Sequence, residues 1–275
     1  MTRPDPDRLL TPEAFDALPA DHVLLVDVGT PERYAEAHIP GAVLVTPAEL
    51  MDGRPPASGR LPEKARLTEL FSRLGLRPQT KVVAYDDEGG GWAGRLLWTL
   101  DVIGHDNWAY LDGGIHAWQA SGRPLEQTPN EPNPRPVSIS IDHEPIAEAE
   151  DILAALAAGD ADLVVWDARS PAEYRGERPA AARSGHIPGA INLDWLELMD
   201  RERQLRLRED LATFLEERGI TPDRQIVTHC QTHHRSGLTW LAARLLGYPR
   251  LKAYHGSWSE WGNRSDTPIQ AGSEP

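Results

Sequence analysis

The sequence of 275 residues contains a single cysteine, Cys230. One thiol allows no disulfide within the chain, no Cys-x-x-Cys redox pair and no cysteine-rich zinc site. Long apolar runs are also lacking: none approaches the roughly 18–20 residues that a membrane helix needs. The N-terminal stretch has no apolar core of the kind found in signal peptides. We therefore expect a cytoplasmic protein with no membrane partner.

Positive charge is scarce as well. There are 28 Lys and Arg residues against 42 Asp and Glu residues, which gives a formal net charge of −14. This balance argues against nucleic acid as a partner. Acidic residues are in turn missing from one segment, since residues 224–259 contain no Asp or Glu but do contain Arg235, Arg244, Arg250, Lys252 and four histidines. We expect a local cationic pocket there, suited to a small anionic substrate.

The chain contains two copies of one unit. The segment "LLVDVGTPERYAEAHIPGAVLV" (24–45) returns, with eight extra residues, within residues 163–193, and "HIPGA" occurs at 38–42 and at 186–190. Such ordered similarity predicts a tandem duplication. We expect an N-terminal domain over 1–126, a proline-rich linker over 127–138 and a C-terminal domain over 139–275.

Each copy has the pattern of an α/β domain. Short apolar runs predict buried parallel strands over 22–27, 81–85 and 108–111, and again over 162–167, 225–229 and 251–254. Thr-Pro pairs at residues 11 and 30 and a capping box at Ser170 predict helix starts between them. Strands that alternate with helices predict a wound parallel β-sheet flanked by helices in each domain. An amphipathic helix is expected after Cys230, with Leu238, Leu241, Ala242 and Leu245 on its apolar face.

The copies differ most at one loop. Asp86 occupies the position of Cys230, and Gly91 occupies that of Arg235. Since the first copy keeps its strand, helix and "HIPGA" segment without a cysteine, the fold does not require the thiol. A lone cysteine after an apolar strand is usually a small buried hydrophobe. The comparison between copies instead favours a catalytic Cys230 in the second domain and a catalytically inactive first domain.

The surroundings predicted for Cys230 favour a thiolate. The residue follows a parallel strand, at the edge of the sheet where ligands bind in open α/β folds. It also precedes a helix N-terminus, whose free N–H groups and dipole lower a thiol pKa. Arg235 adds a cation with a fork suited to oxyanions. The candidate substrate-binding residues are Arg235, Gln231, Thr232, His233, His234 and Ser236, and weaker candidates for the pocket wall are Asp167, Arg169, Glu173 and Trp195.

No cofactor and no metal ion are expected, because adjacent histidines such as His233 and His234 rarely aim at one ion. His38 and His186 occur in both copies, so we expect them to be structural, and His229 is expected to be a satisfied core residue. The tryptophans Trp118, Trp258 and Trp261 are expected in the core. Two domains in one chain make a monomer the simple expectation.

These residues resemble the rhodanese family, the thiosulfate sulfurtransferases, in its tandem two-domain form, over nearly the whole chain. "YAEAHIPGAVLV" (34–45) is similar to the N-terminal family signature, and "YHGSWSEW" (254–261) is similar to the C-terminal one, with His255 an unusual occupant. The loop "CQTHHRSG" (230–237) resembles that of bacterial rhodaneses of the Azotobacter type. Animal rhodaneses instead have Cys-Arg-Lys-Gly-Val-Thr, so Thr232 replaces a substrate-binding lysine, and Glu173 stands where they have an arginine.

The resemblance implies a ping-pong mechanism. The Cys230 thiolate would attack the outer sulfur of thiosulfate and expel sulfite, which leaves a persulfide on the enzyme. Backbone N–H groups of residues 231–236 would hold that sulfur, and Arg235 would orient the sulfonate. Cyanide or a thiol would then accept the sulfur. Asp167 and Arg169 would brace the pocket wall.

Three alternatives remain. The sulfur donor could be 3-mercaptopyruvate. A cysteine phosphatase of the cell-cycle type shares the fold implied by the resemblance but uses Cys-x5-Arg, whereas the spacing here is Cys230-x4-Arg235, a smaller ring of amides suited to one sulfur atom. A non-catalytic binding module is the third alternative, and it fits the first copy better than the second.

Overall fold

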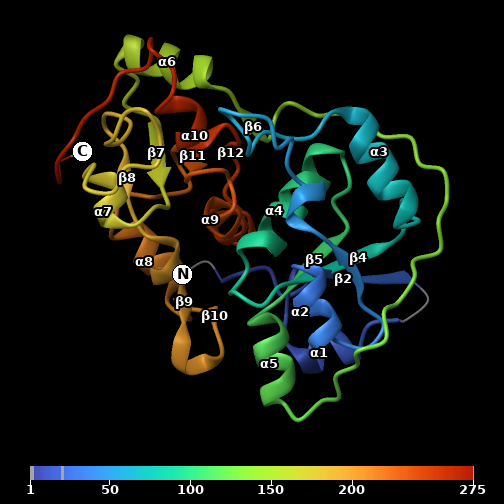
Figure 1. Cartoon of the computed structure of the whole chain (residues 1–275). Coiled ribbons are helices and arrows are strands. Elements are labelled where there is room, and N and C mark those ends of the chain that lie inside the picture. The colour runs from blue at the N-terminus through green and yellow to red at the C-terminus, as the bar shows by residue number, and fades with distance from the viewer. Residues whose placement is uncertain (1–2, 20–21, 275) are drawn as a thin grey trace.

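The structure, a computed structural model, describes residues 3–19 and 22–274 and contains two α/β domains (Figure 1). Each domain is built on a five-stranded sheet in which every pairing is parallel. The first sheet has the order β1(Leu9–Leu10), β5(Trp108–Leu111), β4(Lys81–Tyr85), β2(Val23–Val28), β3(Val43–Val45). The second has the order β6(Ile146–Ala147), β12(Leu251–Tyr254), β11(Gln225–His229), β7(Leu163–Asp167), β8(Ile191–Asn192). The two orders correspond strand for strand, which confirms the predicted fold class.

Helices follow the strands in both domains. The first domain has α1(Pro12–Asp16), α2(Pro31–Glu36), α3(Lys64–Arg73), α4(Gly91–Val102) and α5(Gly114–Ala120), and the second has α6(Ala149–Ala158), α7(Pro171–Tyr174), α8(Leu211–Glu216), α9(Arg235–Leu245) and α10(Ser257–Trp261). A short antiparallel hairpin, β9(Met199–Asp200) and β10(Arg206–Leu207), extends from the second domain. No helix of the described residues has the length and apolar character needed to cross a membrane.

The predicted helix starts are confirmed. The Thr11 and Thr30 side chains accept hydrogen bonds from the N–H groups of Ala14 and Arg33, at the heads of α1 and α2. At the head of α7, Ser170 and Glu173 cap each other's backbone in the predicted capping box. All six predicted strands are present. The six predicted runs leave out the edge strands β1, β3, β6 and β8, which have only two or three residues each and so show little periodicity.

The repeated "HIPGA" segments have the same structural role in both domains. His38 stacks on Tyr34 with 3.8 Å between ring centroids, and His186 stacks on Tyr174 at 3.6 Å. Each histidine Nδ1 contacts the backbone carbonyl of that tyrosine, at 2.7 and 2.9 Å. Both rings are fully buried. The prediction that these histidines are structural is therefore confirmed, and the tryptophans predicted to be core residues are also buried (Trp118, Trp258 and Trp261).

The two domains meet where helices α4 and α9 pack side by side at the centre of the molecule (Figure 1). A Cβ atom placed on Gly94 would lie 2.3 Å from the carbonyl oxygen of Gly237, and one placed on Gly237 would lie 2.3 Å from that of Gly91. Only glycine permits such an approach of two backbones. One hydrophobic core then runs through both domains, from Val26 and Leu96 to Leu241 and Trp240.

Helix α9 corrects the expected amphipathic pattern. Leu238, Leu241, Ala242 and Leu245 are buried, as predicted, but so are Gly237, Thr239, Trp240 and Ala243. Helix α4 of the other domain packs against α9, with Gly94 at Gly237 and the Leu238 side chain beside Gly90. The short sequence window could not reveal a partner helix about 140 residues away.

The predicted linker, residues 127–138, forms neither helix nor strand. It runs along the first domain, where the Asn130 N–H donates to the Tyr34 hydroxyl at 3.0 Å and the Arg135 N–H donates to the Ser72 carbonyl at 2.8 Å. These contacts fit a segment that is stiff and attached rather than freely mobile. The exact domain boundaries at 126 and 139 stay a prediction.

The glycine contact gives a first testable prediction. In most helices Gly→Ala stabilises the protein by about 1 kcal/mol. Gly94→Ala should instead destabilise it by about 1–3 kcal/mol, because the added methyl overlaps the Gly237 carbonyl. Urea unfolding measures the change, and Ala154→Gly at an exposed site of α6 gives the ordinary propensity effect in the same protein. A gain in stability for Gly94→Ala would contradict the contact.

Candidate active site

Cys230 lies directly after β11, at the carboxyl end of the central strand of the second sheet. Its side chain is fully buried. The residues that follow curl into a loop that ends where α9 begins at Arg235. Helix α10 fixes the start of this loop, since the Trp258 N–H donates to the Cys230 carbonyl and the Ser259 N–H donates to the Gln231 carbonyl, both at 2.9 Å.

The environment of Cys230 lowers the pKa of its thiol below the ordinary value. Burial by itself raises this pKa, but the Arg235 guanidinium, the N–H and hydroxyl of Ser236 and the charge of His234 lower it by more. The thiolate is the nucleophilic form of cysteine. The sequence-based expectation of an activated thiol therefore has a structural cause, to which both the cation and the head of α9 contribute.

His233 sets the curl of the loop. Its backbone has φ of 55°, a left-handed conformation that is uncommon for a residue with a side chain. The buried ring contacts the Ser236 hydroxyl through Nδ1 at 2.7 Å and meets Trp98 of α4 edge-on, with 4.5 Å between ring centroids. Burial and the nearby Arg95 lower the pKa of His233 well below its ordinary range, so the ring is neutral. It acts in the loop as a packed, hydrogen-bonded side chain.

His234 is half-buried and has other partners than His233. It stacks on Trp92 with 4.1 Å between ring centroids, and its Nε2 contacts Glu88. Trp195, predicted as a possible pocket wall, lies 5.6 Å from the His234 ring. The two neighbouring histidines thus have separate partners. Across residues 3–19 and 22–274, no group of three or more His, Cys, Asp and Glu side chains is arranged to hold a metal ion.

Arg235 has a partner that the sequence did not predict. Its guanidinium forms a two-pronged ion pair with Glu173, at 2.7 and 2.9 Å. Burial raises the pKa of Glu173, but the hydrogen bonds and charge of Arg235, with Ser170, outweigh it and bring the pKa to about 2. The fork that we expected to be open for an oxyanion is therefore engaged by a carboxylate, although Arg235 remains close enough to stabilise the Cys230 thiolate.

Asp167 and Arg169 lie at the end of β7, the strand next to β11. Both are fully buried and form an ion pair at 2.6 Å, and Arg169 also donates to the Gly185 carbonyl at 2.8 Å. The guanidinium lies over the Trp258 ring, 4.2 Å from its centroid. Burial raises the pKa of Asp167, but His229 and Arg169 together lower it below its ordinary value. The pair is placed as a rigid support beside the catalytic strand.

His229 is buried, as predicted, but it is not fully satisfied. Its Nδ1 contacts the Cys230 carbonyl at 3.2 Å. Its Nε2 lies 3.7 Å from the Asp167 carboxylate, beyond hydrogen-bond distance, and no partner for it occurs among the residues that the structure describes. Burial lowers the pKa of His229, so the ring is neutral near pH 7. The prediction that His229 is a core residue is confirmed, whereas the prediction that its hydrogen-bonding groups are all satisfied is wrong.

The expectation of a local cationic pocket is modified by the fold. Residues 224–259 contain no carboxylate of their own, but folding brings Glu173 to Arg235, Glu88 to His234 and Asp167 to the strand that carries Cys230. Charge along the sequence did not show this, because each of these acids comes from a segment at least 50 residues away. The positive charge around the thiol is therefore largely paired.

Two segments enclose the loop. Gln231 donates to the Ala180 carbonyl at 2.9 Å, so the eight-residue insertion of the second copy reaches over the loop. On the other side, a Cβ atom on Gly59 of the first domain would lie 2.3 Å from the Thr232 carbonyl oxygen. Next to it, the Leu61 N–H donates to His255 at 2.9 Å. The candidate site is thus formed by both domains.

Sequence reasoning missed the residues that the first domain contributes. Arg95 and Trp98 of α4 are fully buried against the catalytic loop, and Glu88 and Trp92 hold His234. One signal for Arg95 was present, since it is the single charged residue in the otherwise apolar run "GWAGRLLWTL" (91–100). A buried arginine needs an explanation.

The corresponding loop of the first domain is closed by its own side chain. The Asp86 carboxylate accepts hydrogen bonds from the N–H groups of Glu88, Gly89, Gly90 and Ala93, at 2.8–3.2 Å. Burial, together with the Glu88 charge, raises the pKa of Asp86 to about 7. A fixed acceptor thus fills the ring of amides at the position where the second domain has a thiol.

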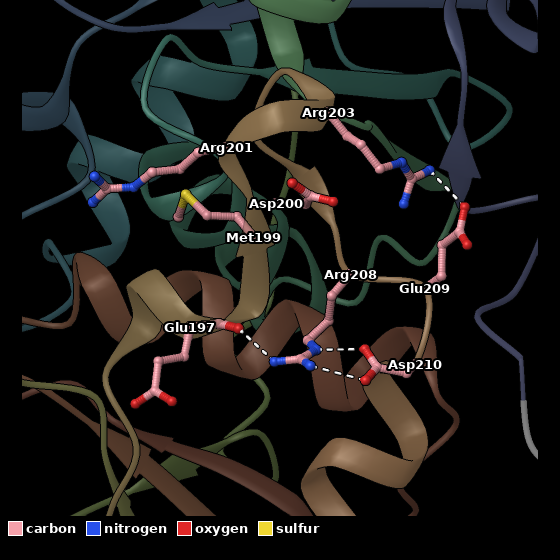
Figure 2. A pocket seen from close by; sticks show the side chains of 8 residues that line it. All are labelled: Glu197, Met199, Asp200, Arg201, Arg203, Arg208, Glu209 and Asp210. Carbon is pink, nitrogen blue, oxygen red and sulfur yellow. Dashed lines mark hydrogen bonds and ion pairs between the residues drawn. The ribbon is translucent and has the colours of Figure 1, made fainter.

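A cavity of about 510 Å³ lies elsewhere, beside the β9–β10 hairpin (Figure 2). Four of its charged lining residues form ion pairs, Arg208 with Asp210 at 2.5 Å and Arg203 with Glu209 at 3.0 Å. None of the predicted site residues lines this cavity. The chemistry therefore points to the buried thiol rather than to the open cavity.

Fold and loop together define a two-domain α/β protein with one activated cysteine at the head of a helix. Comparison with known families then gives its membership: the rhodanese-like domain family matches residues 11–121 and residues 148–264. The chain belongs to the rhodanese family, with one domain in each half.

Similar proteins agree with this assignment. The chain is 55% identical to a thiosulfate sulfurtransferase of Azotobacter vinelandii, over 92% of this chain and 93% of the relative. It is 53% identical to a thiosulfate sulfurtransferase of Pseudomonas aeruginosa with the same coverage. A 3-mercaptopyruvate sulfurtransferase of Escherichia coli is 31% identical, over 89% and 87%. The crystal structure of YnjE has the same fold, with a TM-score of 0.85 and 23% identity over 96% of this chain and 68% of that one.

The Arg235–Glu173 pair gives a pH-dependent prediction. The folded pKa of Glu173, about 2, lies below the ordinary 4.5. Its contribution to stability is therefore fully present above about pH 4.5 and is lost as the pH falls towards 2. Glu173→Gln keeps the capping box but removes the charge, so it should lower the free energy of unfolding by about 1–3 kcal/mol at pH 6. That difference should shrink towards pH 3.

Urea unfolding at several pH values measures this difference. Glu177→Gln is the matched control, because Glu177 forms an exposed pair with Arg175 and should change stability by no more than about 1 kcal/mol. A Glu173→Gln effect that stays constant from pH 6 to pH 3 would show that the ion pair is not its source.

Proposed function

We propose that the protein is a thiosulfate sulfurtransferase, in which Cys230 carries the transferred sulfur as a persulfide. The observation that carries the proposal is the placement of the only thiol. Cys230 lies at the carboxyl end of the central strand and the head of α9, where Arg235 and Ser236 lower its pKa. The high identity to two bacterial thiosulfate sulfurtransferases supports the same activity.

The first half-reaction uses the thiolate as nucleophile. The Cys230 sulfur forms a bond to the outer sulfur of thiosulfate, and the sulfur–sulfur bond of thiosulfate breaks with its electron pair on the departing sulfite. The product is an enzyme persulfide. No oxidant is needed, since the outer sulfur keeps its oxidation state when it moves from thiosulfate to Cys230. A single cysteine suffices because the donor and the acceptor both come from outside.

The second half-reaction returns the enzyme to its starting state. Cyanide or a thiolate attacks the terminal sulfur of the persulfide, and Cys230 leaves as a thiolate. The products are thiocyanate or an acceptor persulfide. The same environment that lowers the pKa of Cys230 makes it a good leaving group here.

The residue roles follow from the geometry of the loop. Backbone N–H groups of residues 231–236 and the Ser236 hydroxyl would hold the transferred sulfur. Arg235 would orient the sulfonate, for which an incoming thiosulfate must compete with Glu173. Gln231, Thr232, His233 and His234 would complete the binding loop, while Asp167, Arg169 and Trp195 would support its wall.

The remaining features of the proposal concern the whole molecule. The first domain, residues 1–126, would be catalytically inactive, because Asp86 fills the loop position of the thiol. Residues 127–138 would link it to the catalytic domain, residues 139–275. We expect the protein to act as a monomer in the cytoplasm, without a metal ion or other cofactor.

Mass spectrometry tests the central step. Incubation with thiosulfate should add one sulfur atom to the intact protein, at Cys230, and cyanide should remove it with release of thiocyanate. Cys230→Ser should take up no sulfur and lose more than about 1,000-fold in kcat, as expected for loss of a nucleophile. Because the chain has no other cysteine, added sulfur can be assigned without ambiguity. A protein that stays unmodified by thiosulfate would exclude the proposal.

A donor comparison tests the choice of thiosulfate. We expect kcat/KM for thiosulfate to exceed that for 3-mercaptopyruvate, measured with cyanide as common acceptor. The E. coli relative makes 3-mercaptopyruvate the appropriate competitor. Hydrolysis of an aryl phosphate should be negligible, because the loop spacing is Cys-x4-Arg. A preference for 3-mercaptopyruvate would change the donor but leave the persulfide chemistry in place.

A further inference from the structure

Arg95 of the first domain is a fully buried cation that the proposed reaction does not yet use. It lies on α4, one turn before Trp98, whose ring it covers at 4.9 Å. In the described part of the chain, no carboxylate lies within ion-pair distance of its guanidinium, and its Nε has no hydrogen-bond partner. A buried, unpaired charge costs several kcal/mol. Such a cost is most readily explained by a functional role.

The guanidinium is held in place by carbonyl groups. It donates to the Leu50 carbonyl at 2.6 Å and to the Gly59 carbonyl at 2.8 Å, with longer contacts of 3.4 Å to Arg60 and His233. These acceptors are neutral, so they orient the cation without cancelling its charge. The His233 carbonyl belongs to the catalytic loop itself. Arg95 therefore reaches the loop from the domain that lacks a thiol.

The group of opposite charge that acts on the pKa of Arg95 is the Cys230 thiolate. Burial lowers the pKa of Arg95 to about 9, and the Cys230 thiolate opposes this change. Arg95 remains a cation near pH 7. The other titratable groups around it are His233 and His255, whose buried rings have lowered pKa values and are neutral, and the cation Arg60, which is paired with Glu148 and Glu260.

We propose that Arg95 is a positioning residue for sulfur transfer: it holds the catalytic loop through the His233 carbonyl and supplies, from the first domain, an unpaired cation that stabilises negative charge on Cys230 and on its persulfide. Arg235, by contrast, shares its charge with Glu173. The thiolate thus has one paired cation from its own domain and one unpaired cation from the other. The first domain is then a part of the active site and not only its inactive duplicate.

Alkylation of the single thiol tests the charge directly. The rate of reaction of Cys230 with iodoacetamide is measured against pH, and its midpoint gives the thiol pKa. Arg95→Met and Arg95→Gln should each raise the midpoint by at least about half a pH unit, and kcat/KM for thiosulfate at pH 7 should fall accordingly. Arg95→Lys, which keeps the charge but not the fork, should return the midpoint towards the wild-type value.

The matched control is Arg244→Met. Arg244 is also an arginine at the α4–α9 contact, but its charge is paired with the Asp101 carboxylate at 2.8 Å, a partner of the kind that Arg95 lacks. The Arg244→Met variant should leave the alkylation midpoint of Cys230 unchanged, although it should lower the free energy of unfolding. If Arg95→Met does not fold, the polar Arg95→Gln decides the question. Two results would overturn the assignment. One is an unchanged midpoint in a folded neutral variant, Arg95→Met or Arg95→Gln. The other is a shift in Arg95→Lys as large as that in the neutral variants.

This inference rests on Cys230 being the nucleophile of the proposed function, but its test needs no sulfur donor. A protein that takes no sulfur from thiosulfate, yet shows a raised alkylation midpoint in the Arg95 variants, would refute the proposed function and retain the role of Arg95. If the wild-type protein forms the persulfide but the Arg95 variants leave the alkylation midpoint unchanged, the proposed function is retained and the role of Arg95 is refuted.

Discussion

The close approach of α4 and α9 is the contact on which the rest of the structure depends. The backbones of the two helices meet at Gly94 and Gly237, where any side chain would overlap a carbonyl group. Because α9 begins at the catalytic loop and α4 begins at its counterpart in the first domain, this contact also brings the two loops together. A fold-level constraint therefore sets which residues can surround the thiol.

One consequence is that the catalytic loop takes its shape from both domains. His233 has a left-handed backbone conformation, which the loop can keep only if its surroundings favour it. Its ring packs on Trp98 and its carbonyl accepts from Arg95, both on α4. His234 is held in the same way by Trp92 and Glu88. The second domain supplies the chemistry, and the first supplies much of the rigid surroundings.

The sequence was sufficient to predict the fold class, the duplication and six strands, because each depends on local periodicity or on comparison within the chain. It also identified Cys230, since Asp86 stands in its place in the first copy. It did not predict that Glu173 pairs with Arg235, that nearly all of α9 is buried or that Arg95 reaches the loop. Each of these is a contact between segments far apart in the chain, which no short window can contain.

The two loops show how duplication can separate stability from function. In the first domain the Asp86 carboxylate accepts from four N–H groups of the loop and of the first turn of α4, so that loop needs no ligand to be complete. In the second domain a thiol replaces the carboxylate, and a thiol is a weak acceptor. The thiolate form is then stabilised by cations around the loop in addition to the N–H and hydroxyl of Ser236. Burial raises the pKa of a thiol that lacks such cations, so the chemistry of one copy depends on the other copy being placed against it.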